Sequence, residues 1–252
     1  MDDAPGKELI RKRFRRGLHT YSDAADVQSL MADTLCSMIA GVRTWFPSVL
    51  EIGAGTGLLT DRLDRAIAWK RRIVNDLVEE YAQFHTHRTG TIFLPGDAET
   101  LKWGCQHFDL ICSNAAFQWL ADLPAFFKKL RKVLAPDGLL AFTSFGPDNL
   151  KELRALTGHG LHYYSIRQLT EKLVQCGFTV ADSREEVLTW LFDDPLDILK
   201  KMRQTGVTAS SDKSWWTPRR LAEFRRAYLE QFGTREQQVK LTWHPVYILA
   251  KA

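Results

Sequence analysis

The feature that most restricts the fold of this 252-residue chain is a short apolar strand that runs into a glycine-rich turn and then a helix. The strand and the turn together occupy residues 49–57, with glycines at 53, 55 and 57. A helix is expected at 58–66. Glycine admits positive φ and close approach of a ligand, and free N–H groups at the helix start point toward that ligand. A dinucleotide fingerprint would need glycine where Leu58 stands, so the spacing disfavours a pyrophosphate ligand.

The glycines at 53, 55 and 57, with the acidic Glu51 inside the preceding strand, form a G-x-G-x-G motif. This motif resembles the first motif of class I S-adenosylmethionine methyltransferases. A tight strand-to-helix turn that binds nothing is the alternative reading of the same residues.

From residue 49 onward, apolar strand-like segments alternate with helical ones, as a parallel doubly wound sheet requires. We expect parallel strands at residues 49–52, 72–75, 91–94, 108–113 and 139–145. A helix at 123–134 should end in a turn at 136–138, and segments 185–192 and 243–249 should form an antiparallel pair at the sheet edge. The predicted fold class is α/β, a Rossmann-like doubly wound sheet.

The chain reads as a single domain over residues 1–252 with a composite helical lid. Residues 1–41 form a predicted N-terminal cover, in which Phe14, Leu18 and Tyr21 share one helical face. Lid insertions are expected at 147–162 and 194–233, separated by a packing helix that ends at Gly177.

Polar side chains follow three successive strands at the edge where α/β sheets bind ligands. Asp76 suits both ribose hydroxyls of a nucleoside, Asp97 suits an adenine amino group, and Asn114 follows the fourth strand. Helix capping or turn formation is the alternative role for each acid. Three such residues after a glycine turn favour a bound ligand.

Composition excludes several other classes of protein. Hydrophobic residues make up 45% and charged residues 25%, which is typical of a globular domain. We expect a cytoplasmic protein, because no apolar run reaches membrane-spanning length and no signal-peptide pattern opens the chain. The four cysteines are far apart and lack histidines at metal-ligand spacing, so no metal is expected. Clustered basic residues are compatible with solvated helices or with docking of nucleic acid or an acidic protein.

Segments distributed along nearly the whole chain resemble the malonyl-acyl-carrier-protein O-methyltransferases of biotin biosynthesis, the BioC family. The likeness begins with Phe14, Arg16, Tyr21 and residues 26–28. It continues through VLEIGAGTGLLT at 49–60, SNAAFQWL at 113–120, LLAFTSFGPDNLKELR at 139–154, HYYS at 162–165, LKKMRQTGV at 199–207 and LTWHPVYILAKA at 241–252. Two departures are Ala54, where the family often has cysteine, and the unusually basic segment 68–72.

The resemblance implies S-adenosylmethionine as cofactor and assigns roles to the candidate residues. Asp76 would lie at the ribose, Asp97 and Ala98 at the adenine, and Asn114 beside the sulfonium. Gly53, Gly55 and Gly57 would approach the methionine part, and Arg16 and Tyr21 would close over the cofactor from the N-terminal helix. Glu51, Ala54 and Leu77 complete the expected cofactor-binding set. A core aromatic is the alternative role for Tyr21.

The implied substrate is a malonyl group on the phosphopantetheine arm of an acyl carrier protein, methylated at its free carboxylate to prime pimeloyl synthesis. That carboxylate is ionised near neutral pH, so no general base is needed and alignment is the main task. One orienting arginine is expected, Arg154 or Arg203, with an exposed salt bridge as the alternative for both. The acidic carrier would meet basic lid residues, namely Lys200, Lys201, Arg219, Arg220, Arg225 and Arg226.

Three other functions remain open from the sequence. A class I methyltransferase for another small molecule or a quinone would have the same cofactor half. A nucleic-acid methyltransferase is disfavoured because residues 114–117 lack the Asn/Asp-Pro-Pro-aromatic turn, and no RNA-binding aromatic motif is present. A non-catalytic module that binds the cofactor or the carrier is the third. We expect neither a nucleic-acid nor a membrane partner.

Overall fold

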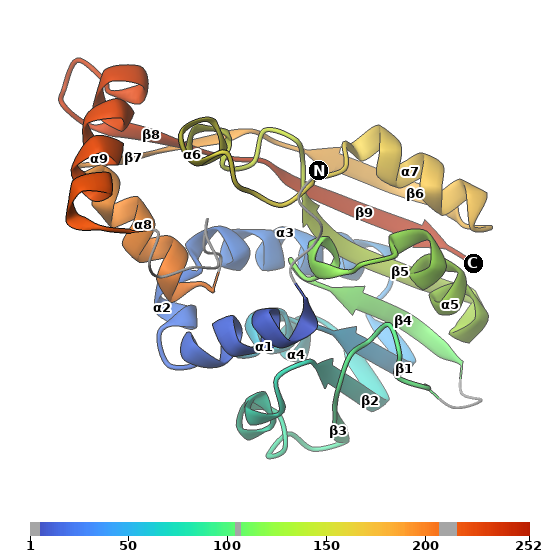
Figure 1. Ribbon diagram of the computed structural model, residues 1–252. Coiled ribbons are helices and arrows are strands. Elements are labelled where there is room, and N and C mark those ends of the chain that lie inside the picture. The colour runs from blue at the N-terminus through green and yellow to red at the C-terminus, as the bar shows by residue number, and fades with distance from the viewer. Residues whose placement is uncertain (1–5, 104–106, 207–215) are drawn as a thin grey trace.

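A seven-stranded sheet runs through the centre of the molecule in the order β3-β2-β1-β4-β5-β9-β6 (Figure 1). The computed structural model describes residues 6–103, 107–206 and 216–252. The first five strands of that order are parallel, and β9 runs antiparallel to both of its neighbours. The strands are β1 Trp45–Ile52, β2 Ala68–Asp76, β3 Thr91–Pro95, β4 Phe108–Ser113, β5 Leu134–Phe145, β6 Thr179–Glu185 and β9 Pro245–Lys251.

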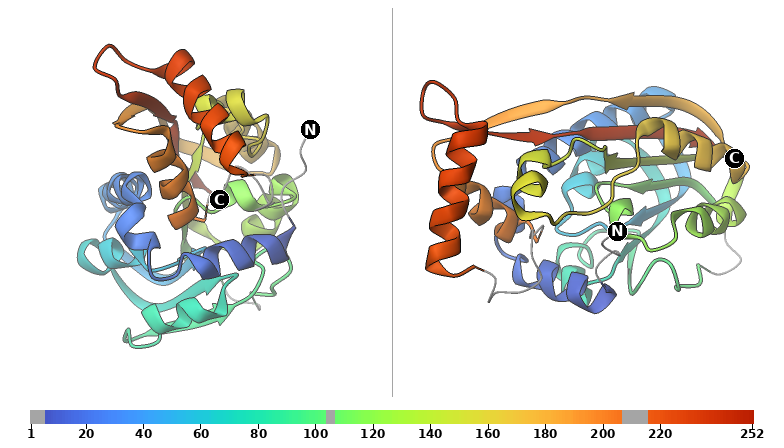
Figure 2. Two further views of the ribbon diagram at one scale, coloured as in Figure 1. Left: turned by 60° about the vertical axis from the view of Figure 1, so that its left-hand side comes forward. Right: turned by 45° about the horizontal axis from the view of Figure 1, so that its top comes forward.

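Helices cover both faces of this sheet, and α1 lies across its carboxyl edge (Figures 1 and 2). Alternate strand residues feed two separate cores: Val49 and Leu110 pack on the α3 and α4 side, whereas Leu50 and Ile111 pack on the α5 and α7 side. The helices are α1 Lys7–Arg16, α2 Tyr21–Ala24, α3 Asp26–Val42, α4 Leu58–Ala66, α5 Leu123–Val133, α6 Lys151–Thr157, α7 Ile166–Gln175, α8 Pro195–Gln204 and α9 Pro218–Phe232, with short 3₁₀ turns η1 Glu79–Phe84 and η2 Phe117–Trp119. The predicted α/β fold class is confirmed.

The C-terminal strands differ from the prediction. The chain forms one long antiparallel ribbon, in which β6 pairs with β9 in the main sheet and β7 Leu188–Phe192 pairs with β8 Val239–Trp243 in a separate two-stranded sheet. The expected segment 185–192 therefore merged the end of one strand with the next and missed β6. Figure 2 shows α9 at the outer end of the β7–β8 ribbon, away from the main sheet.

Two local predictions are also wrong. The expected turn at 136–138 lies within β5, whose register against β4 shifts between Phe108 and Leu110 to accommodate the extra residues. The expected continuous N-terminal helix is interrupted between α1 and α2. The break falls at Gly17, where a Cβ would lie 2.8 Å from the carbonyl oxygen of Gln204 at the end of α8. The close approach of these two segments requires glycine.

The predicted lid insertions contain α6 in the first and α8 and α9 in the second. Both α8 and α9 begin with a side-chain cap followed by proline, in which Asp194 accepts from Leu196 N–H and Thr217 accepts from Arg220 N–H. The local sequence thus fixes where each lid helix starts.

The basic segment 68–72 has a structural role. The guanidinium of Arg72 is buried, stacks 4.1 Å from the ring centre of Trp69 and pairs with Asp64 at 2.6 Å. Arg71 donates to the Ser48 hydroxyl at 2.9 Å. These arginines join β2 to β1 and α4, so they need no ligand to explain them.

Candidate cofactor site

The glycine turn between β1 and α4 has the left-handed backbone that its sequence predicts. The φ angles are +68° at Gly53, +54° at Gly55 and +96° at Gly57. A Cβ at Gly53 would lie 2.4 Å from the Cβ of Ala116, whereas a Cβ at Gly55 would meet no atom within 4 Å. Gly53 therefore permits close packing between two protein segments, and Gly55 faces open space that a ligand can enter.

Asp76 at the end of β2 is tied to this turn. Its carboxylate accepts from Gly55 N–H at 2.8 Å and from Val78 N–H at 2.9 Å. Burial raises the pKa of Asp76 to about 6, although the backbone hydrogen bonds oppose the shift. Each carboxylate oxygen accepts one backbone hydrogen bond and has a further lone pair that can accept from a ligand hydroxyl.

His85 holds the same peptide from the other side, a contact that the sequence analysis missed. Its Nε2 lies 2.9 Å from the carbonyl oxygen of Gly55, so this nitrogen must carry the proton and donate. The ring stacks on Phe93 at 5.8 Å, and burial lowers the pKa of His85 to about 4. The backbone of Gly55 is thus held on both sides: Asp76 accepts from its N–H group, and neutral His85 donates to its carbonyl oxygen.

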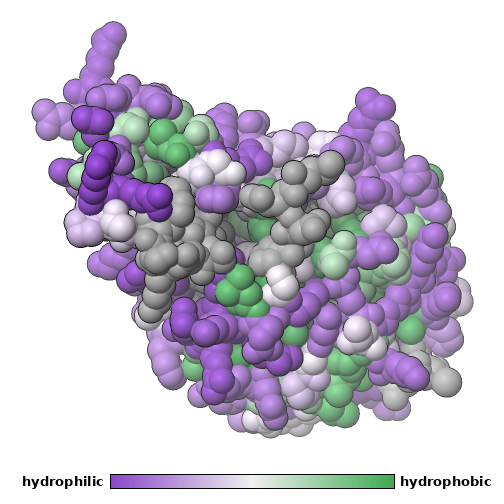
Figure 3. Space-filling model, viewed as in Figure 1, coloured by the Kyte–Doolittle hydropathy of each residue, from purple (hydrophilic) through white to green (hydrophobic). Residues whose placement is uncertain are grey.

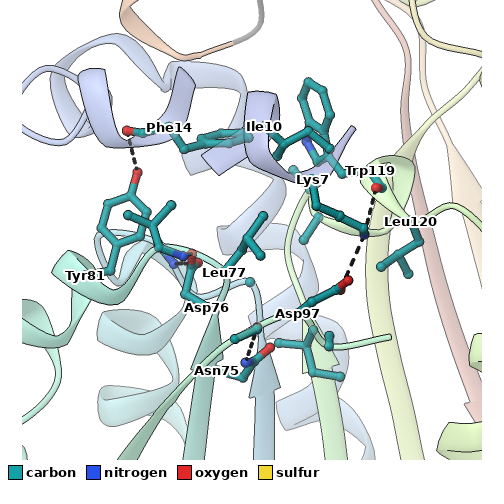
Figure 4. Close-up of a pocket in the computed structure, with 18 of the residues that line it drawn as sticks. Lys7, Ile10, Phe14, Asn75, Asp76, Leu77, Tyr81, Asp97, Trp119 and Leu120 are labelled. Carbon is teal, nitrogen blue, oxygen red and sulfur yellow. Dashed lines mark hydrogen bonds and ion pairs between the residues drawn. The ribbon is translucent and has the colours of Figure 1, made fainter. Parts of the chain in front are cut away.

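A hollow opens above the strand ends, between the glycine turn and α1 (Figure 4). It contains about 720 Å³ of space free of protein atoms, part of it open to solvent. The lining comprises Lys7, Ile10, Phe14, Tyr21, Ile52, Gly53, Gly55, Asn75, Asp76, Leu77, Val78, Tyr81, Gly96, Asp97, Ala98, Asn114, Ala115, Ala116, Trp119 and Leu120. Eight predicted cofactor residues are among them: Tyr21, Gly53, Gly55, Asp76, Leu77, Asp97, Ala98 and Asn114.

Asp97 shares its end of the hollow with a lysine from α1. Lys7 Nζ lies 3.5 Å from Asp97 Oδ1, also pairs with Glu99, and donates to the carbonyl oxygen of Trp119 at 3.2 Å (Figure 4). These contacts fasten the start of α1 to the end of β3. No local pattern predicts these contacts, because Lys7 and Asp97 are 90 residues apart.

Asn114 is held rigidly at the end of β4. Its Nδ2 donates to the Gln28 carbonyl oxygen at 2.9 Å, and its Oδ1 accepts from the Thr143 hydroxyl at 2.7 Å. Thr143 Oγ1 also accepts from Ala115 N–H at 2.8 Å, where φ is +52°. Both ends of the Asn114 amide are therefore engaged within the protein, and Asn114 shapes the floor of the hollow.

Aromatic side chains close the hollow from above. Phe14 contacts Trp119 edge-to-face at 5.4 Å, and Tyr81 donates from its hydroxyl to the Phe14 carbonyl oxygen at 3.2 Å. Burial and the nearby Asp76 carboxylate raise the pKa of Tyr21. Arg16 is exposed at the end of α1 and lies outside the hollow.

Three other predicted residues support the turn from outside the hollow. Glu51 is buried and accepts from the Thr60 hydroxyl at 2.9 Å, and burial raises its pKa to about 7. Ala54 donates from its N–H to the Asn75 carbonyl oxygen at 3.1 Å. Gly57 makes room for Arg88, which a Cβ would approach to 3.2 Å. These residues set the shape of the turn.

The two candidate orienting arginines are in different environments. Arg154 donates to the Pro147 carbonyl oxygen just beyond β5, and its guanidinium lies 5.8 Å from the ring centre of Tyr163. Arg203 is exposed near the end of α8. Neither arginine lines the hollow.

The residues of the hollow fit an adenosyl ligand. Two carboxylates, Asp76 and Asp97, lie at neighbouring strand ends, apolar side chains surround them, and the open space at Gly55 would be filled by a group on the ligand. Carboxylates accept hydrogen bonds from hydroxyl and amino groups, and the aromatic walls suit a purine. Within the described ranges, no group of three or more His, Cys, Asp or Glu side chains could hold a metal ion.

Comparison of the sequence with known proteins identifies the family of this chain. Residues 50–142 match the family described as "Methyltransferase domain". A malonyl-[acyl-carrier protein] O-methyltransferase of Porphyromonas gingivalis is 38% identical over 97% of this chain and 95% of its own length. The enzyme of the same name from Chlorobium luteolum is 39% identical over 96% of this chain and 94% of its own. This chain belongs to the malonyl-[acyl-carrier protein] O-methyltransferase family.

The predicted family is thereby confirmed, together with S-adenosylmethionine as its cofactor. Solved structures of other proteins have the same fold as this chain. A Burkholderia thailandensis 1,6-didemethyltoxoflavin-N1-methyltransferase with bound S-adenosylhomocysteine has a TM-score of 0.58, with 17% identity, over 97% of this chain and 87% of its own. The [4+2]-cyclase SpnF has a TM-score of 0.55 and 16% identity over 87% and 80%. Proteins of such different reactions share the fold, so the fold alone leaves the acceptor open.

Helices long and apolar enough to cross a membrane are absent from the described parts of the chain.

Proposed function

We propose that this protein transfers a methyl group from S-adenosylmethionine to the free carboxylate of a malonyl group carried on acyl carrier protein. The product is the malonyl methyl ester, which would prime pimeloyl synthesis for biotin in the cytoplasm. The observation that carries this proposal is the identity of 38% to a malonyl-[acyl-carrier protein] O-methyltransferase over almost the whole of both chains. The hollow supports it because its residues suit an adenosyl cofactor.

Specific residues would hold the cofactor in this hollow. The Asp76 carboxylate would accept from the ribose hydroxyls, and Asp97 would accept from the adenine amino group. Gly53 and Gly55 would let the methionine part approach the backbone, with Gly55 held in place by Asp76 and His85. When bound, S-adenosylmethionine supplies a methyl group on a positively charged sulfur.

The proposed reaction needs no proton transfer by the protein. A malonyl carboxylate has lost its proton well below neutral pH, so its oxygen could accept the methyl group directly. The electron pair of the broken carbon–sulfur bond would stay with sulfur, leaving S-adenosylhomocysteine. Histidine and cysteine are absent from the described lining of the hollow, which agrees with this chemistry. The protein's task is to align the reactants and exclude water, with Phe14, Tyr21 and Trp119 forming the cover.

Arg154 is the better placed of the two arginines to orient the malonyl carboxylate. It is anchored just beyond β5, the strand beside β4, and Asn114 in the floor of the hollow directly follows β4. A single anchored cation can set the direction of the carboxylate without holding the ground state too tightly.

The test is turnover by the purified protein with S-adenosylmethionine and a panel of acceptors. Malonyl-carrier protein, malonyl-CoA, free malonate and a quinone precursor would be incubated separately, and methyl esters or ethers identified by mass spectrometry. We expect a methyl ester on the malonyl thioesters. Methylation of only the quinone would favour the small-molecule alternative, and cofactor binding without turnover of any acceptor would favour a non-catalytic module.

A further inference from the structure

The N-terminal cover and the second lid insertion (194–233) are in contact. The end of α1 touches the end of α8, because Thr20 donates from its hydroxyl to the Gln204 carbonyl oxygen at 3.3 Å and Gly17 lies against the same oxygen. Gly206, just beyond α8, lies against the ring of Phe14, where a Cβ would be 3.2 Å away. Phe14 also lines the hollow, so this junction is one side chain away from the cofactor site.

Basic residues that lack acidic partners collect on the outward sides of both helices. On α1, Ile10 and Phe14 face the hollow, so helical geometry turns Lys12 and Arg16, one turn apart, to the opposite side. On α8, Ile198 and Met202 are buried, and helical geometry likewise directs Lys200 and Arg203 outward. Lys12, Arg13, Arg16, Lys200 and Arg203 define the junction patch.

None of the five junction-patch residues makes a salt bridge or side-chain hydrogen bond with any residue in the described ranges. Lys12, Arg16, Lys200 and Arg203 are exposed, and Arg13 is half-buried. Burial lowers the pKa of Arg13, and no acidic group opposes this shift. Hydrophilic side chains dominate the surface over α1 in the space-filling view (Figure 3).

Several other basic residues of α1, α8 and α9 form ion pairs with the protein's own acids. Arg15 pairs with Glu80 at 2.6 Å on the other flank of α1, and Lys201 pairs with Asp26. On α9, Arg219 pairs with Glu223 at 2.8 Å and Arg225 with Asp194 at 2.7 Å. Among the lid cations that the sequence singled out, Lys201, Arg219, Arg225 and Arg226 are thus already paired with acids.

We propose that the junction patch, rather than α9, is the surface on which the acidic acyl carrier protein docks. This inference rests on the proposed function. The unpaired positive charges complement an acidic carrier. Two of them, Arg16 and Arg203, directly precede Gly17 and Gln204, the residues through which α1 and α8 touch. A carrier seated there would also contact α1, which lines the hollow, and α8, which touches the end of α1.

The test compares two charge-reversal variants. Lys12→Glu/Lys200→Glu reverses one exposed cation on each helix of the junction patch. Lys128→Glu/Lys132→Glu makes the same charge change on α5, on the opposite side of the molecule from α8 (Figure 1). KM and kcat would be measured with malonyl-carrier protein and with malonyl-CoA, each at low and high salt.

We expect the junction variant to raise KM for malonyl-carrier protein on the order of tenfold at low salt, with a weaker salt dependence than the wild type. Its kinetics with malonyl-CoA, which lacks the carrier, should match the wild type. The α5 variant should match the wild type with both substrates. Equal effects of the two variants would mean that net charge alone matters and would overturn the proposal, as would an unchanged KM in the junction variant.

Direct binding separates failure of this surface from failure of the proposed function. Fluorescence anisotropy with labelled malonyl-carrier protein reports docking even if no methyl group is transferred. Binding that the junction variant weakens and the α5 variant leaves intact supports the surface whatever the reaction. A junction variant that loses affinity for transfer RNA but keeps its affinity for the carrier would contradict it.

Discussion

Replacement of Gly53 or Gly55 by alanine should separate the two roles of the glycine turn. Both residues have positive φ, +68° and +54°, so alanine at either position costs about 1–2 kcal/mol in backbone strain. Only at Gly53 would the new methyl group also collide, since it would lie 2.4 Å from the Cβ of Ala116. Overpacking of this kind adds about 1–3 kcal/mol.

The free energy of unfolding should therefore fall by about 2–5 kcal/mol for Gly53→Ala but only by about 1–2 kcal/mol for Gly55→Ala, as measured by urea denaturation. Affinity for S-adenosylmethionine should show a different pattern. The alanine methyl at position 55 would project into the hollow and weaken binding about tenfold, equivalent to about 1.4 kcal/mol, as measured by calorimetric titration.

Gly158→Ala is the matched control. Gly158 has φ +68° and no atom within 4 Å of an added Cβ, and it lies outside the hollow. It should lose stability like Gly55→Ala and bind the cofactor like the wild type. The reasoning fails if Gly55→Ala binds S-adenosylmethionine as tightly as Gly158→Ala, because the space above Gly55 would then not belong to the cofactor.

Three further predictions concern the groups around the turn. His85→Phe keeps the stacking on Phe93 but removes the donor to the Gly55 carbonyl oxygen. The affinity for S-adenosylmethionine should fall about threefold to tenfold in a calorimetric titration. An unchanged Kd would show that this hydrogen bond does not contribute to cofactor binding. The ionised Asp76 carboxylate is a better acceptor for ribose hydroxyls than the protonated form. The Kd for S-adenosylmethionine should therefore rise as pH falls through about 6 and stay level above about 7. A Kd that does not change from about pH 5 to 8 would contradict this role of Asp76. Burial raises the pKa of Glu51 from 4.5 to about 7, so this carboxyl loses its proton at lower pH in the unfolded state than in the folded state. The free energy of unfolding of the wild type should therefore decrease as pH rises from about 4.5 to 7. Urea denaturation of Glu51→Gln should lack this part of the pH dependence, and identical pH slopes of the two proteins would refute the prediction.

The parts of the fold that the sequence predicted are those with a strong local pattern. The five parallel strands carry apolar runs, and glycine or acidic residues mark where several of them end, so the turn, Asp76, Asp97 and Asn114 could be located from spacing alone. Strand β6 was missed because as an exposed edge strand it buries no residue fully, and its sequence TVADSRE has no apolar run. Only pairing with β9, more than 60 residues later, makes it a strand.

The missed site residues also depend on contacts between distant parts of the chain. His85 follows a short 3₁₀ turn and resembles any surface histidine in sequence, yet it reaches Gly55 thirty residues earlier. Lys7 reaches Asp97 and Glu99 from the first turn of α1. The arginines of α9 form a cluster of positive charge in the sequence. In the folded protein, Arg219 pairs with Glu223 on the same helix, and Arg225 pairs with Asp194 at the start of α8.

Calorimetric titration of the wild type and Asp76→Asn with S-adenosylmethionine tests most directly whether the strand ends hold the cofactor. Asparagine keeps an acceptor oxygen but loses the charge and places an amide donor against one of the two backbone N–H groups, Gly55 or Val78. We expect tight binding by the wild type and a loss of at least tenfold in Asp76→Asn, with the stability of the fold measured in parallel. Equal affinity of the two proteins for S-adenosylmethionine would contradict the account.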